Sequence, residues 1–282
     1  MSAPAEGSTS TIRDSGQLLV AGRLWHELAE SFRNPGFWAM SSWLDILVRS
    51  RKSFLGPLWL LAPAVVYVFG IGAFFAGMYG SRISEFATHV GLGMIVFRLL
   101  MSALIGSAGV FSSSHSFILD GHMRLTDYIL QSLARTSFDL LMFLPVTAVA
   151  LALRGGADLQ GLLLAVPTMF LIYLNALWIS VAFAVIGARF TDFGHLLVNV
   201  SLFMFLLTPI IWYTESVPEG SLRARLMQMN PLYHFVEVFR SPIMGKPVET
   251  VSVAVVGVMT IAGLLLATWL YRRYARYVPL WI

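Results

Sequence analysis

The chain has 282 residues, 57% of them hydrophobic and only 12% charged, whereas a soluble domain carries about a quarter charged residues. This composition predicts an all-α membrane protein, and the absence of cysteine excludes disulfides, thiolate metal sites and cysteine nucleophiles. The net charge of +4 comes from cations spread between apolar runs and not gathered on one face, so nucleic-acid binding is not expected.

The N-terminal part precedes the first long apolar run. Residues 1–17 are small and polar and lack the apolar core of a signal peptide, which predicts a disordered cytoplasmic tail. Residues 18–52 show two helical apolar stripes separated by Asn34-Pro35-Gly36, and they predict amphipathic helices at the membrane interface. The first stripe is formed by Trp25, Leu28, Ala29 and Phe32, and the second ends in the cations Arg49, Arg51 and Lys52.

Six apolar runs within residues 53–282 predict a six-span transmembrane domain, with spans at residues 54–80, 86–111, 138–153, 161–188, 193–213 and 251–271. The first run contains no charged residue, and Pro63 is expected to bend or loosen its helix. Six spans put both termini on one side of the membrane. Twelve lysines and arginines lie on that side and six on the other, which predicts cytoplasmic termini by the positive-inside rule.

Two polar segments interrupt this pattern. Residues 112–137 have room for one short helix between two spans. Residues 214–250 are too polar to cross the membrane, but Asn230-Pro231 predicts a helix start within them. We expect two short helices here that re-enter the outer side of the membrane, where irregular backbone must be surrounded by protein or water.

Isolated polar residues give weaker indications. Arg98 lies within the second run, and because lipid exposure would cost at least ~2.5 kcal/mol it must face protein or water. Both a pathway role and a structural role remain open for it. His234 and Glu237 are three residues apart on a helix, but two ligands alone are a poor indication of a metal site. No catalytic triad is indicated.

No GxxxxGK[ST] phosphate-binding loop occurs in the sequence. Nucleotide binding and hydrolysis by that route are therefore not expected of this chain. If its function consumes ATP, the energy must come from another polypeptide.

Three stretches carry a resemblance to a known family: RSRKSFLGPLWLLAP at residues 49–63, ARFTDFGHLL at residues 188–197 and NPLYHFVEVFRSPIMG at residues 230–245. Together, along nearly the whole chain, they resemble the membrane permease subunits of ABC transporters that export polysaccharides such as O antigen, capsule and teichoic acid. The resemblance implies a homodimer that pairs with two copies of an ABC ATPase subunit. ATP and Mg would bind to that partner, and no cofactor is expected in this chain.

The resemblance also implies a location for each part of the machinery. Residues 112–128 would hold the helix that couples to the ATPase, with the candidates Asp120, His122, Arg124 and Asp127. Residues 214–245 would close the outer end, and the candidate gate residues are Pro209, Trp212, Tyr213, Asn230, Pro231, His234, Glu237 and Arg240. From charge alone, we expect Arg49, Arg51 and Lys52 to meet the phosphate of a lipid-linked glycan at the substrate entrance.

Aromatic residues near the span ends are expected mostly to pack against protein or lipid. Some of them would be able to stack on sugar rings along a transport path. The channel candidates are Trp59, Tyr67, Trp178 and the cation Arg98.

The sequence thus predicts a permease in the bacterial inner membrane that exports a lipid-linked polysaccharide, with O antigen as the expected glycan. The stretch ILDGHMRLTDYILQ at residues 118–131 lacks the lysine-rich, proline-containing sequence of many O-antigen permeases, so the choice among glycans stays open. Three alternatives are an exporter of drugs or small lipids with the same architecture, a membrane-embedded glycosyl- or acyltransferase, and a scaffold without substrate. A transferase would act without an ATPase.

Overall fold

A computed structural model of the chain describes residues 23–51, 56–119, 123–218 and 220–282. Within these ranges the secondary structure is helical and contains no β-strand, which confirms the all-α prediction. The predicted tail 1–17 and the candidates Lys52, Asp120 and His122 lie outside the described residues. Arg49 and Arg51 are described only as the backbone of the last turn of α3.

Five helical segments are long and apolar enough to cross a membrane. They are the composite segment Trp59–Tyr79, α6 (Ile83–Ala108), α9 (Leu125–Arg154), α10 (Leu159–Arg189) and the segment Thr250–Trp281, which begins with α14 (Thr250–Tyr274). The fifth predicted span corresponds to α11 (Phe193–Leu207), which has 15 residues. At 1.5 Å per residue it is about 22 Å long, shorter than the ~30 Å hydrocarbon core.

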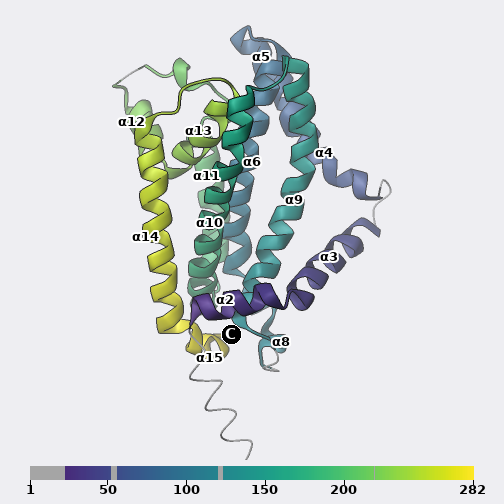
Figure 1. The fold of residues 1–282 in the computed structure, drawn as a ribbon, viewed down its shortest axis with the longest axis vertical. Helices are drawn as coiled ribbons and strands as arrows, with labels where there is room; N and C mark the ends of the chain where they lie inside the picture. Colours follow the sequence, from purple (N-terminus) through teal and green to yellow (C-terminus); the bar gives the residue numbers. More distant parts are fainter. Residues whose placement is uncertain (1–22, 52–55, 120–122, 219) are drawn as a thin grey trace, which may run out of the picture.

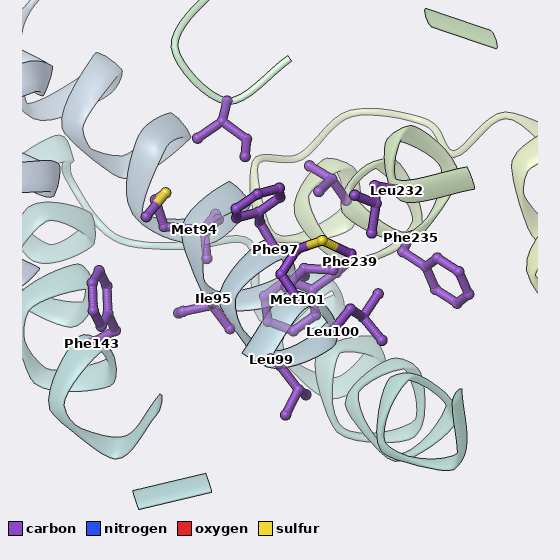
Figure 2. Packing of buried hydrophobic residues seen from close by; sticks show 14 of the residues in the cluster. Met94, Ile95, Phe97, Leu99, Leu100, Met101, Phe143, Leu232, Phe235 and Phe239 are labelled. Carbon is purple, nitrogen blue, oxygen red and sulfur yellow. The ribbon is translucent and has the colours of Figure 1, made fainter. Parts of the chain in front are cut away.

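Helix α6 lies at the centre of the bundle and packs against α9, α10, α11 and α13 (Pro231–Ile243) (Figure 1). Apart from a few polar residues such as His89 and Arg98, its side chains are mostly apolar, as expected of a helix surrounded by others. Figure 2 shows Phe97, Leu99 and Leu100 of α6 among Phe143 and Phe239, which come from α9 and α13. These side chains form the main hydrophobic core.

The first span is irregular, as expected from Pro63. It consists of a 3₁₀ turn η1 (Gly56–Leu61), α4 (Ala62–Val65), a π-helical turn η2 (Val66–Ile71) and α5 (Gly72–Tyr79). The segment ends at Gly80, whose φ of 62° favours glycine.

The polar segment between the second and third spans differs from the prediction. Two short helices, α7 (Val110–Ser113) and α8 (His115–Leu119), follow α6, and α9 begins already at Leu125. The predicted third span is therefore only the second half of a 30-residue helix. Hydropathy did not reveal the first half because its polar side chains contact the N-terminal helices, as Arg135 does with Asp45 of α3.

The N-terminal helices are α2 (Leu24–Arg33) and α3 (Gly36–Arg51), so the predicted break at Asn34-Pro35-Gly36 is confirmed. They lie across one end of the bundle, below α9 in Figure 1. Only part of the predicted apolar stripe of α2 is buried in the protein: Leu28 is buried, whereas Trp25 and Phe32 are exposed. The buried face of α2 instead includes Glu27 and Ser31, because both find polar partners on other helices.

The predicted outer segment contains α12 (Leu222–Met229) and α13, which confirms two short helices. The helix start is also confirmed, since Pro231 occupies the first turn and the Asn230 side chain accepts a hydrogen bond from the Leu232 backbone at 3.0 Å. Helix α13 is largely buried between α6, α10 and α14. It lies at the opposite end of the bundle from α2 (Figure 1).

Candidate functional site

The candidate site at the α13 end is built around Arg240, which is only 4% exposed. Its Nη1 donates to the Pro209 carbonyl at 2.6 Å, and its Nη2 lies 3.5 Å from a carboxylate oxygen of Glu237. The hydroxyl of Ser241 donates to the other Glu237 oxygen. A buried guanidinium loses its hydration, and it is tolerated here because a carboxylate and a carbonyl replace the lost water.

His89 of α6 approaches the same backbone segment from the other side. Its Nε2 lies 3.1 Å from the Trp212 carbonyl and 3.1 Å from Nη1 of Arg240. Since arginine only donates and a carbonyl only accepts, Nε2 satisfies one of these two partners at a time. Helices α6 and α13 thus both hold the segment that follows α11.

Aromatic rings complete this cluster. The Tyr213 ring lies 4.7 Å from the His89 ring and 5.0 Å from the Phe86 ring, both edge-to-face. Trp212 is buried, and the Arg223 guanidinium lies 4.6 Å from its ring centre. The segment 208–213 is therefore fixed by side-chain packing as well as by hydrogen bonds.

The remaining gate candidates lie in the same region. Asn230 donates to the Thr208 hydroxyl at 2.9 Å. His234 contacts the Ser252 hydroxyl through Nδ1 and the Gln228 carbonyl through Nε2, each at 2.9 Å. Both nitrogens are thus engaged in helix packing, and among the described residues no three histidine, aspartate or glutamate side chains gather to bind a metal.

An exposed ion pair also lies at this end of the bundle. Nζ of Lys246 donates to Glu215 at 2.6 Å. Partial burial acts to raise the pKa of Glu215, but the hydrogen bond and the charge of Lys246 outweigh it, so this pKa lies below its ordinary value.

The α2 end of the bundle contains the described coupling candidates. Nε and Nη2 of Arg124 donate to one Glu30 oxygen at 2.8 and 2.7 Å, and the Arg124 backbone donates to Asp127 at 3.1 Å. The hydroxyls of Ser31 and Thr126 lie 2.8 Å apart. The first turn of α9 is thus attached to two adjacent residues of α2, Glu30 and Ser31.

A further buried contact at this end was missed from the sequence. The Tyr271 hydroxyl of α14 donates to Glu27 of α2 at 2.5 Å, although the residues are 244 positions apart. Glu27 is one of four charged residues in and next to the first amphipathic stripe, and nothing in that pattern marks it as buried. Only a partner from the last helix explains its position.

The channel candidates do not come together in one place. Arg98 lies over the Phe143 ring of α9 at 4.7 Å, a cation–π contact that keeps its charge within protein. Trp178 donates to Asn175 at 2.8 Å and packs against Gly263 of α14, so it contributes to helix packing. Trp59 is 59% exposed, and Tyr67 is half-buried against the core.

Comparison with known proteins identifies the class. Residues 36–244 match the family model of the ABC-2 type transporter membrane proteins, so the chain belongs to that family. It is a multi-pass membrane protein and a transport subunit, which argues against the transferase and scaffold alternatives.

A curated relative narrows the comparison. The chain is 20% identical over 202 residues to the O-antigen export system permease protein RfbA of Myxococcus xanthus. The alignment covers 70% of this chain and 76% of the relative.

Proposed function

We propose that this chain is the permease subunit of an ABC exporter that moves a lipid-linked polysaccharide, of the O-antigen class, across the bacterial inner membrane. The observation that carries the proposal is the family match over residues 36–244, to which the name of the Myxococcus relative adds the glycan class. The drug or small-lipid exporter of the same architecture is the alternative that the experiment below separates.

In the proposed assembly two copies of the chain form the translocation path, with α11 as a short sixth span and both termini in the cytoplasm. Two copies of an ABC ATPase subunit bind at the α2 end. ATP and Mg belong to that partner, whose phosphate-binding loop supplies what this sequence lacks.

The contacts at the α2 end support a route for the coupling motion. The ATPase would contact α8 and the segment that leads to Arg124. Because Arg124 binds Glu30 and Arg135 binds Asp45, a displacement there is carried to α2 and α3. Helix α3 ends at Arg51, so the motion would reach the proposed entrance of the glycan phosphate.

The buried cluster around Arg240 supports an outer gate that is closed at rest. Thr208 and Pro209 are held by Asn230 and Arg240 from the two ends of α13, and Trp212 is held by His89 of α6. Opening would require these contacts to separate together.

The test is reconstitution of the purified chain with its cognate ATPase in proteoliposomes. Added lipid-linked O antigen is expected to stimulate ATP hydrolysis and to appear on the far side of the membrane. The control is an ATPase variant with the lysine of its GxxxxGK[ST] loop replaced, which should abolish both signals.

Three compounds, each added separately, distinguish the two candidate functions: the glycan-bearing lipid, the same lipid without glycan, and a hydrophobic drug. Stimulation by the glycan-bearing lipid alone supports polysaccharide export. Equal stimulation by the bare lipid or the drug would replace this proposal with the small-substrate exporter.

A further inference from the structure

An apolar groove lies beside the elbow between α2 and α3. It has a volume of about 330 Å³ and is lined by Phe32 and Trp38 of the elbow, by α9 from Leu130 to Leu141, and by Tyr173 of α10. This volume is at the lower end of the ~300–1,000 Å³ range of small-molecule sites. The groove therefore suits a slender apolar ligand.

The walls of the groove are held in place by the elbow itself. The Trp38 indole donates to the Ser31 carbonyl at 2.8 Å, and the rings of Phe32 and Trp38 contact each other edge-to-face at 6.1 Å. Phe32 nevertheless remains 57% exposed.

The direction of the groove matches that of an acyl chain in a bilayer. It follows α9, a membrane-spanning helix, and from Leu130 to Leu141 at 1.5 Å per residue it extends about 16 Å. One end lies at the α2–α3 elbow, which the proposed topology puts at the cytoplasmic leaflet, where anionic lipids reside.

The charge near the elbow end of the groove indicates which kind of lipid headgroup would bind there. Arg33 follows Phe32, is exposed, and forms no ion pair among the described residues. Tyr173 also lines the groove, and its hydroxyl has no hydrogen-bond partner among the residues that the structure describes. A cation and a free donor beside an apolar groove complement the phosphate, the ester oxygens and the chain of a phospholipid.

We propose that this groove binds an anionic phospholipid of the bilayer, with one acyl chain along α9 and the headgroup at Arg33. Since the elbow connects α2 to α3, the bound lipid would stabilise the angle between these helices. The site is separate from the proposed glycan entrance at the far end of α3, and it does not depend on which substrate is exported.

The experiment uses the full chain in vesicles of phosphatidylcholine doped with phosphatidylglycerol that carries a photoreactive group in one acyl chain. Crosslinks are expected on peptides that contain Trp38, Leu130–Leu141 or Tyr173. Ala134→Trp fills the groove and should lower their yield several-fold. The matched control is Ala148→Trp, which adds the same bulk to an exposed position farther along α9.

The headgroup is tested separately. Arg33→Gln should lower labelling by phosphatidylglycerol about fivefold, the effect of one basic residue at an anionic surface, whereas Arg23→Gln at the other end of α2 should not. Tyr173→Phe keeps the volume and removes the donor, so it tests the site even if Ala134→Trp fails to fold.

Four results would overturn the proposal. Equal labelling of Ala134→Trp and Ala148→Trp, or equal labelling by phosphatidylcholine with no effect of Arg33→Gln, would indicate ordinary boundary lipid. Loss of lipid labelling from the groove peptides when the chain dimerises would indicate that a second copy of the chain covers the groove. Displacement by a lipid-linked glycan but not by phosphatidylglycerol would assign the groove to the transported lipid.

Discussion

At the scale of single residues, buried charges have the largest effect on stability. Arg240 and Glu27 are both nearly fully buried. Arg240 is compensated by Glu237, three residues earlier, and by the Pro209 carbonyl, and Glu27 by the Tyr271 hydroxyl of the last long helix. Removing one member of such a pair leaves the other without compensation, which usually costs more than the pair contributes.

Arg240→Met should therefore destabilise the protein by about 3–5 kcal/mol, because Glu237 loses its cation and the Pro209 carbonyl its donor. Unfolding in mixed detergent micelles measures this loss. The double variant Glu237→Gln with Arg240→Met should lose less than the single one. The control is Arg225→Met, at an exposed position of α12, which should change stability by under about 0.5 kcal/mol. If Arg225→Met lost as much stability as Arg240→Met, the burial of Arg240 would not explain the effect.

At the scale of helices, close approach depends on glycines that face a neighbouring backbone. A Cβ at Gly187 of α10 would overlap the Ala108 carbonyl at the end of α6, and a Cβ at Gly161 would overlap the Pro242 carbonyl of α13. Small residues let membrane helices pack at short distance, where lipid gives no hydrophobic drive for association. The ends of α10 are thus fixed against α6 and α13.

Gly187→Ala should cost about 1–3 kcal/mol or more, since the obstacle is backbone that cannot rotate away. Gly257→Ala in α14 is the matched control, because nothing lies within 4 Å of its added Cβ. That variant should be neutral or up to about 1 kcal/mol more stable through helix propensity alone. Thermal unfolding of both purified variants measures the difference. Equal stability of the two variants would contradict the claim that Gly187 is needed for the close contact between α10 and α6.

At the scale of the whole molecule, the two ends are built differently. The α13 end is held by a buried cluster around Arg240. The α2 end also has buried contacts, such as Tyr271 with Glu27, but the ion pair that attaches the start of α9 to α2, Arg124–Glu30, is partly exposed. Exposed pairs contribute only about 0–1 kcal/mol to stability. The Arg124–Glu30 contact is therefore easier to break than the buried cluster around Arg240.

Arg124→Glu should accordingly change stability by less than about 1 kcal/mol but lower export several-fold while ATP hydrolysis by the assembled complex continues. The charge swap that adds Glu30→Arg should restore export. Lys246→Glu breaks an exposed pair at the opposite end and should leave export unchanged. Normal export by the single Arg124→Glu variant would rule out this contact as the coupling route.

The sequence predicted the features of the fold that depend on local signals. The long apolar runs, the break at Asn34-Pro35-Gly36 and the helix start at Asn230-Pro231 were all predictable, because hydropathy, proline and capping act locally. The length of α9 and the burial of Glu27 were not, since both depend on polar partners from other helices. For the candidate site, the sequence indicated the segment around residue 240 but not its pairing with His89, 151 positions away.

The π-helical turn Val66–Ile71 has a consequence for how this chain aligns with its relatives. A π turn fits one more residue into a helix than an α turn does, without rotating the faces on either side. Homologues whose first span is a continuous α-helix are therefore expected to be one residue shorter between the positions of Pro63 and Gly72. A one-residue gap in that interval would support this expectation, and an ungapped alignment to such a homologue would contradict it.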